Sequence, residues 1–404
     1  MPTPDDDRFN GLIFTLSYAC IYFAAPVVYI GIVQAGLSDK LGASAAIANL
    51  PASTYSLGQV APLFFSWLIP HRLERTTVVT ANLITALGLA AVCLTLILPL
   101  PDGVRIAALS IQGLFQGLSG STSHVFMIQC LGRGTTAVGR ANALRRTFTI
   151  TPIAAVAGSL LAQYVLNPGL PGVKYPWDFA LLYGIGFPCI LGVAMLSSRY
   201  RFAEIPEEPR QPLGRFLAVS IKSFFSDPAL ARVWIAYLLF YMSLGVTSNL
   251  SLYAKEALGR DPTDFSGITL AIRFGCKAIG GLAIGWIAVR HGFKVAALAC
   301  MGLLAASGLW AWAVPGFPYL LSVGLLGAGE LGGMYIPNLV ATLSSVADGP
   351  RNLAINALAT PVSSFAPVLH GWMTDRFGFA SSFLFDVVTA IAGGLLIFGV
   401  KRKA

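Results

Sequence analysis

The sequence is poor in charged residues. Only 11% of its 404 residues are Asp, Glu, Lys or Arg, whereas a soluble domain has roughly 25%. Hydrophobic residues make up 55% of the chain, and the mean hydropathy is +0.71. This composition excludes an ordinary soluble domain and is typical of an all-α protein that crosses a bilayer many times.

Clusters of catalytic or metal-binding side chains are also lacking. The six cysteines lie in or at the ends of apolar segments without any CxxC spacing, and the four histidines are scattered along the chain. The phosphate-binding pattern GxxxxGK[ST] is absent. We therefore expect no cofactor, no metal and no enzymatic activity, and we interpret the cysteines as small core residues.

A basic segment before the first apolar stretch is missing as well. The chain begins MPTPDDDRFN, which is acidic and does not resemble a cleaved signal peptide. The hydropathy pattern predicts twelve transmembrane helices. Their expected ranges are 11–36, 46–69, 76–99, 104–130, 142–166, 177–197, 230–254, 265–289, 293–314, 317–345, 352–374 and 381–400.

Basic residues are distributed unevenly between the two sides of this arrangement. Most of the 27 Lys and Arg fall on the side of the N-terminus, including the Lys401–Lys403 tail. The other side holds Lys40, Arg105, Lys174, Lys255, Arg260 and Arg376. The positive-inside rule then predicts a cell (inner) membrane protein with both termini in the cytoplasm. The net charge of +9 is a topology signal, so we expect a lipid bilayer and no nucleic acid as partner.

The two halves of the chain share a pattern. A glycine-rich segment, a polar loop and a Thr-Pro pair recur, at Thr151-Pro152 and at Thr360-Pro361. This predicts two six-helix bundles related as parallel repeats, residues 1–198 and 229–404. Between them, 199–228 is expected to be a cytoplasmic linker whose apolar residues recur at helical spacing, as in an amphipathic helix on the membrane surface.

Three charged residues fall inside predicted spans. Arg273 and Lys277 lie four apart, so they share one face of the helix 265–289. Glu330 lies about 20 Å from the outer end of the helix 317–345, at a depth that matches Lys277. Intramembrane charges are expensive and usually functional, so we expect these residues to bind substrate, with Glu330 also carrying a proton. A permanent structural ion pair is the alternative.

The loop after the helix 265–289 carries a family pattern. Gly285, Arg290, Gly292 and Lys294 follow the loop signature of the major facilitator superfamily, with Val289 in place of its aspartate. With twelve spans, a central linker and a repeat, nearly the whole chain resembles that superfamily. The resemblance implies that these four residues form a gating loop. The equivalent loop after 46–69 lacks both glycine and aspartate, and Glu74 is the candidate replacement.

The resemblance also implies which helices surround a central cavity, namely the first, fourth, seventh and tenth. Their polar residues are then candidate substrate ligands. The alternative is that these side chains only form contacts between packed helices. For substrate we name Gln116, Tyr22, Tyr241 and Asn249. In addition to Glu330, His124 is a candidate for the proton-coupling role, as a proton relay.

These features predict a secondary active transporter that acts as a monomer on a small molecule. Two cations against one acid favour an organic anion, with coupling to protons left open. An exporter of drugs or amphiphiles, using the tyrosines, is the alternative with the same fold. A non-transporting receptor or a membrane-embedded enzyme is the alternative of another class, but the chain shows neither a soluble domain nor a convergent catalytic cluster.

Overall fold

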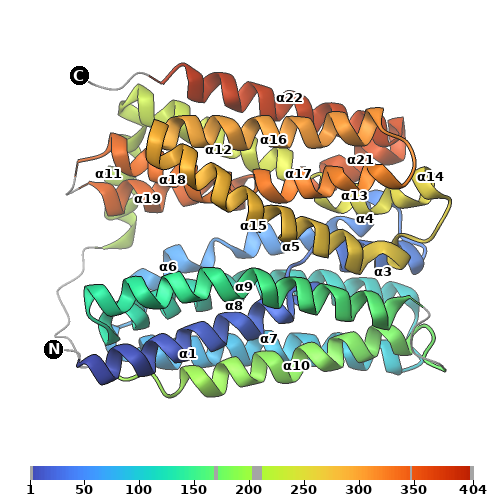
Figure 1. The fold of residues 1–404 in the computed structure, drawn as a ribbon, viewed down its shortest axis with the longest axis horizontal. Helices are drawn as coiled ribbons and strands as arrows, with labels where there is room; N and C mark the ends of the chain where they lie inside the picture. Colours follow the sequence, from blue (N-terminus) through green and yellow to red (C-terminus); the bar gives the residue numbers. More distant parts are fainter. Residues whose placement is uncertain (1–2, 168–171, 203–211, 346–347, 401–404) are drawn as a thin grey trace. The chain divides into compact units, whose positions relative to one another are not determined.

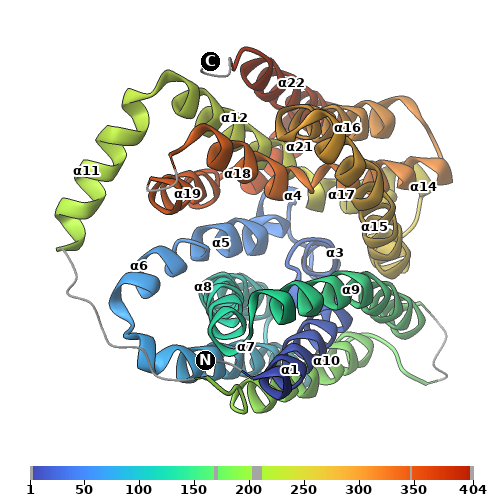
Figure 2. The same ribbon diagram turned by 60° about the vertical axis from the view of Figure 1, so that its left-hand side comes forward.

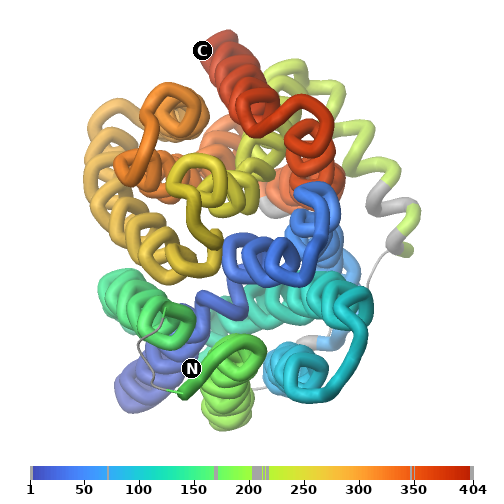
Figure 3. The backbone as a smooth tube through the Cα atoms, turned by 90° about the vertical axis from the view of Figure 1, so that its right-hand side faces the viewer, coloured from blue at the N-terminus to red at the C-terminus, as the bar shows by residue number. Residues whose placement is uncertain are grey.

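The computed structural model describes residues 3–167, 172–202, 212–345 and 348–400, and in these ranges the regular structure is entirely helical (Figure 1). The Lys401–Lys403 tail lies outside the described residues. Figure 3 looks along the long helices and shows many of them nearly end-on.

The helices follow one another with short connections. The first part of the chain forms α1 (Pro4–Phe23), α2 (Ala25–Val28), α3 (Ile32–Lys40), α4 (Ala45–Ala48), α5 (Leu50–Gly58), α6 (Ala61–Leu68), η1 (His71–Leu73), α7 (Glu74–Ile97), α8 (Asp102–Gly134), α9 (Ala137–Leu166) and α10 (Trp177–Ser197). The second part forms α11 (Leu213–Ser226), α12 (Pro228–Leu244), α13 (Thr247–Leu252), α14 (Ala254–Leu258), η2 (Pro262–Phe265), α15 (Ser266–His291), α16 (Phe293–Ala313), η3 (Phe317–Leu320), α17 (Leu321–Gly329), α18 (Gly332–Leu343), α19 (Gly349–Ala357), α20 (Ala359–Val362), α21 (Ala366–Phe377) and α22 (Phe379–Phe398).

Nine helical stretches of the described chain are long and apolar enough to cross a membrane. They correspond to all the predicted spans except 11–36, 46–69 and 104–130. The first of these is divided among the 20-residue α1 and the shorter α2 and α3, and the second among short helices. The third, α8, is a continuous helix of 33 residues that carries many polar side chains. The chain is therefore a multi-pass membrane protein, and these three spans stay predictions.

The first predicted span is interrupted between α2 and α3, where Gly31 adopts φ 151°. An interruption inside a bilayer must satisfy the backbone groups that it frees. The Val27 carbonyl accepts from Gln112 Nε2 at 2.9 Å and from Gln34 Nε2 at 3.2 Å, and Tyr183 donates to Gln112 Oε1 at 3.2 Å. These buried side chains replace the missing helical hydrogen bonds, so they fix the interruption in place.

The chain forms two compact units. Each unit contains one short segment that lies within the other unit's part of the sequence. One unit comprises residues 1–42, 54–209 and 263–271. The other comprises residues 43–53, 210–262 and 272–404. The domain boundaries expected from the sequence, at 198/199 and 228/229, stay predictions, and the exchanged segments were not foreseen.

Segment 43–53 is held in the second unit by specific bonds to α21. The Asp375 carboxylate accepts from the backbone N–H groups of Ala45, at 2.9 Å, and Ala46, at 3.0 Å. Farther along, Ser53 Oγ accepts from the backbone N–H of Val368 at 3.2 Å. A Cβ on Gly371 would lie 2.6 Å from Ala46 Cα, so only glycine lets the two backbones approach this closely.

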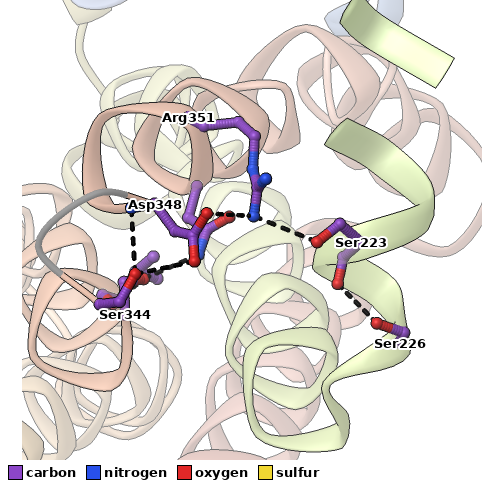
Figure 4. A network of polar contacts seen from close by, with 8 residues as sticks. Ser223, Ser226, Ser344, Asp348 and Arg351 are labelled. Carbon is purple, nitrogen blue, oxygen red and sulfur yellow. Dashed lines mark hydrogen bonds and ion pairs between the residues drawn. The ribbon is translucent and has the colours of Figure 1, made fainter. Parts of the chain in front are cut away.

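The predicted linker contains the helix α11, which is anchored to the start of α19 (Figure 4). Arg351 Nη2 donates to Ser223 Oγ at 3.1 Å and pairs with Asp348 at 2.9 Å. Phe224 is buried, whereas Val219 and Phe225 are exposed. One side of α11 therefore packs on its own unit and leaves an apolar side uncovered.

Helix α12 begins after an Asp-Pro pair, a combination that is typical of helix starts. Asp227 Oδ1 accepts from the backbone N–H of Ala229 at 2.8 Å, and Pro228 occupies the first helical position. The two Thr-Pro pairs of the predicted repeat, by contrast, differ locally. Pro152 lies inside the continuous helix α9, whereas Pro361 lies in the four-residue helix α20.

Candidate functional site

A carboxylate between two cations lies inside the second unit. Arg273 Nε donates to Glu330 Oε1 at 2.5 Å, and Arg273 Nη2 also pairs with this oxygen. Lys277 Nζ donates to Glu330 Oε2 at 2.9 Å. The exposed fractions of the three side chains are 11% for Arg273, 8% for Glu330 and 27% for Lys277. The pair that the matched depths allow is therefore present, with both cations on one carboxylate.

Small residues let the two helices approach closely enough for these bonds. A Cβ on Gly327 of α17 would overlap the carbonyl oxygen of Arg273, and one on Gly324 would lie 2.7 Å from Cys276 Sγ. Such glycine-lined contacts are typical of membrane helices. Glu330 itself sits in the interruption between α17 and α18, so its side chain projects from the point where the helix changes course.

The charge of this cluster is not balanced by Glu330 alone. Two cations and one carboxylate leave a formal positive excess. Arg273 Nη1 is buried and has no hydrogen-bond partner among the described residues. An unsatisfied guanidinium nitrogen in a buried site is costly, and it is well suited to donate a hydrogen bond to an anionic oxygen.

Two tyrosines of α12 lie next to the same interruption. Tyr237 and Tyr241 hydroxyls are 3.1 Å apart, and the Tyr237 hydroxyl donates to the Gly333 carbonyl at 3.3 Å. Gly333 lies only three residues after Glu330. The half-buried Tyr241 therefore lies near the backbone that follows Glu330, and its role as a substrate ligand stays a prediction.

The first unit holds the other aromatic candidates. The Tyr18 hydroxyl is hydrogen-bonded to His124 Nδ1 at 2.7 Å. The rings of Tyr18 and Tyr22 have centroids 6.5 Å apart, and those of Tyr22 and Tyr29 are 5.3 Å apart. His124 is exposed, whereas Tyr18 is buried. One side of the histidine ring is therefore accessible, and the other is hydrogen-bonded to Tyr18. Gln116, on the same helix α8, is buried.

In this structure Asn249 bonds within the protein, and its role as a substrate ligand stays a prediction. It is fully buried, its Oδ1 accepts from Asn49 at 2.7 Å, and its Nδ2 donates to Thr374 at 2.8 Å and to Ser382 at 2.9 Å. Every hydrogen-bonding atom of the amide is thus used within the protein. Asn49 could not be predicted as its partner, because nothing in the spacing brings residue 49 to residue 249.

The predicted gating loop connects α15 and α16. Gly292 has φ 84°, a conformation that favours glycine, and Gly285 lies near the Tyr335 hydroxyl. The Arg290 guanidinium lies 5.2 Å from the Trp286 ring centroid. Lys294 Nζ donates to the carbonyls of Phe398 and Val400, at 2.8 and 2.7 Å. In this structure Lys294 therefore binds the end of α22, and the gating role of the loop stays a prediction.

The candidate replacement for the missing loop aspartate, Glu74, is buried and paired. Its Oε2 accepts from Arg133 Nη1 at 2.7 Å, within the first unit. Arg133 also stacks on the Phe202 ring at 4.7 Å. Glu74 thus holds the C-terminal end of α8, and its role as the replacement for the loop aspartate stays a prediction.

The chain resembles known transporters. The model of the Major Facilitator Superfamily matches residues 11–275 and 233–404. A D-xylose-proton symporter is 16% identical, with a TM-score of 0.70 over 97% of each chain. The nucleoside transporter NupG is 11% identical, with a TM-score of 0.68 over 98% of each chain.

A peptide transporter, POT, solved in complex with sulfate, is similar as well. It is 13% identical, with a TM-score of 0.72 over 98% of this chain and 96% of that one. No curated protein sequence matches the chain. At these identities the solved structures show a common fold and give no information on the substrate of this chain.

Proposed function

Because the chain belongs to the major facilitator superfamily, we propose that it is a secondary active transporter that moves a small organic anion by alternating access. The family and the structural neighbours are transporters, so the fold indicates transport rather than catalysis. The anionic character of the substrate is our inference from the charged cluster.

The observation that carries this proposal is the positive excess around Glu330. The carboxylate already occupies Arg273 Nε and Nη2 and Lys277 Nζ, while Arg273 Nη1 is left over. A carboxylate or phosphate on the substrate would pair with the guanidinium through two parallel hydrogen bonds. Glu330 and the substrate then compete for the same cations.

This competition supplies a route to proton coupling. A proton on Glu330 would weaken its hold on Arg273 and free the guanidinium for substrate, and loss of the substrate would restore the ion pair. One structural neighbour is described as a proton symporter, so the fold accommodates such coupling. His124, hydrogen-bonded to Tyr18, is the second candidate proton carrier.

Replacing Arg273 tests the charge of the substrate. We expect anions, but not sugars or organic cations, to raise the melting temperature of the purified wild-type protein. Arg273→Ala should remove that increase, because it deletes the bidentate donor. Arg232→Ala is the matched control, since Arg232 donates only to the Gly399 carbonyl at the far end of α22. Stabilisation by neutral or cationic compounds alone, unchanged in Arg273→Ala, would exclude an anionic substrate.

From the distribution of basic residues, we also propose that the N-terminus and α11 lie in the cytoplasm. In a variant whose six native cysteines are replaced, a cysteine at Gly172 should react with an impermeant maleimide added to intact cells. A cysteine at Ser223 should react only after the membrane is permeabilised. The segment around Glu207, another informative position, lies outside the described residues. Labelling of Ser223→Cys in intact cells would overturn the proposed orientation.

A further inference from the structure

A second acid, Asp386, is buried in α22 away from the charged cluster. Helix α22 packs against α12 and α16 (Figure 2). The Asp386 side chain is fully buried, and Oδ1 accepts a hydrogen bond from Ser243 Oγ of α12. Oδ2 has no hydrogen-bond partner among the described residues. A Cβ on Gly308 of α16 would lie only 2.6 Å from Oδ2, so the backbone of α16 closes over the carboxyl group.

The cations of the neighbouring helices lie far from this acid. Arg232 of α12 and Lys294 of α16 donate to the carbonyls of Gly399, Phe398 and Val400. Those carbonyls follow Asp386 by twelve residues or more, which is about 18 Å along a helix. The remaining titratable or charged residues of the elements that pack on α22 are Tyr237, Tyr241, Cys300, His370, Asp375 and Arg376, of which the last two lie at the end of α21, before α22 begins.

His370 is the base that α21 places against α12 and α22, and its partners accommodate an uncharged ring. His370 Nε2 lies 2.9 Å from the Met242 carbonyl, so it must carry a hydrogen. Nδ1 lies 2.8 Å from Ser382 Oγ, which accepts from Asn249 Nδ2. Donation of the Ser382 hydroxyl hydrogen to Nδ1 gives each of these atoms a partner with a neutral imidazole.

We propose that Asp386 is a proton-binding site and is neutral in this conformation. An ionised carboxylate here would have one hydroxyl donor, an unpartnered oxygen and no cation, which a buried site strongly disfavours. A protonated carboxyl group in the same surroundings carries no net charge, which removes the larger part of that cost. Water or a cation reaches Oδ2 only if α16 or α12 moves away from α22, so release of this proton is linked to that movement. The site is separate from Glu330 and does not depend on the substrate.

Infrared spectroscopy of the reconstituted protein tests the proposal without any substrate. At neutral pH, we expect a C=O stretching band of a protonated carboxyl group that shifts on deuteration. Asp386→Asn should abolish this band while preserving the shape of the side chain and the bond to Ser243. Glu330→Gln is the matched control and should keep the band. No band in the wild type, or an undiminished band in a folded Asp386→Asn protein, would overturn the assignment.

A second variant covers the case in which Asp386→Asn does not fold. Ser243→Ala removes the hydroxyl that bonds Oδ1 and leaves the acid itself in place. The frequency of a carboxyl band depends on its hydrogen bonds, so the band should shift to that of a free carboxyl group. A band whose frequency is the same in wild type and Ser243→Ala would show that it belongs to another acid.

Discussion

Glu330→Gln is expected to separate exchange from accumulation. The amide keeps one acceptor oxygen for Arg273 but can neither ionise nor release a proton, so the variant should behave as permanently protonated. In proteoliposomes, with an anion identified by thermal shift, counterflow exchange should persist. Uptake driven by an imposed pH gradient should fall to the level seen without the gradient. The melting temperature should drop, because two buried cations lose a carboxylate that accepted from both.

The structural alternative predicts a different outcome for the same variant. Breaking a buried pair by removing one partner usually costs about 3–5 kcal/mol. If the cluster only fixes α15 against α17, Glu330→Gln should unfold easily and lose exchange together with accumulation. Arg273→Gln in the same chain should then restore part of the stability, because one of the two cations is removed as well. A folded Glu330→Gln protein with full gradient-driven uptake would show instead that Glu330 does not carry the coupled proton.

Gly327→Ala is expected to disrupt the charged cluster although it replaces none of the charged residues. The added methyl group would overlap the carbonyl oxygen of Arg273, which belongs to the backbone and cannot rotate away. Helix α17 must therefore move away from α15, and overpacking of this kind costs about 1–3 kcal/mol. We expect a lower melting temperature and loss of the stabilisation by anions, because Arg273 and Glu330 are carried by the two helices that separate.

Gly281→Ala provides the matched control on α15. A Cβ at this position meets nothing within 4 Å. Since alanine in a helix is favoured over glycine by about 1 kcal/mol, this variant should be as stable as the wild type or more so. Equal melting curves and equal anion binding for Gly327→Ala and the wild type would mean that the two helices are not held at this distance in the membrane.

Much of the fold could be predicted because a membrane span can be recognised from the composition of one continuous stretch of sequence. Long apolar stretches and the cap at Asp227-Pro228 depend on neighbouring residues alone, and they matched the structure. The interruptions after Val28 and at Glu330 did not follow from hydropathy, because an interrupted span is as apolar as a continuous one. They depend on distant partners such as Gln112, which replaces the lost bonds to Val27.

The candidate site was predictable only where depth and charge restrict the partners. Lys277 and Glu330 are rare charges at matching depths, and few other partners were available to them. The surroundings of Asn249 could not be predicted, because a polar residue in a span looks the same whether it faces substrate or other amides. The surroundings of Asp386 could not be predicted from its own span either. The structure places it in a fully buried site with a hydroxyl partner, since its surroundings come from α12 and α16.

The exchange of short segments between the two units has a consequence for biosynthesis. Ala45 is made early, yet its partner Asp375 is 330 residues later in the chain. At about 5–20 residues per second, the ribosome needs roughly 16–66 s to supply that partner. During this interval segment 43–53 lacks its final contacts, and the first unit also waits for residues 263–271. Neither half can therefore finish folding before the other has been synthesised, and two separately expressed halves would each lack a piece.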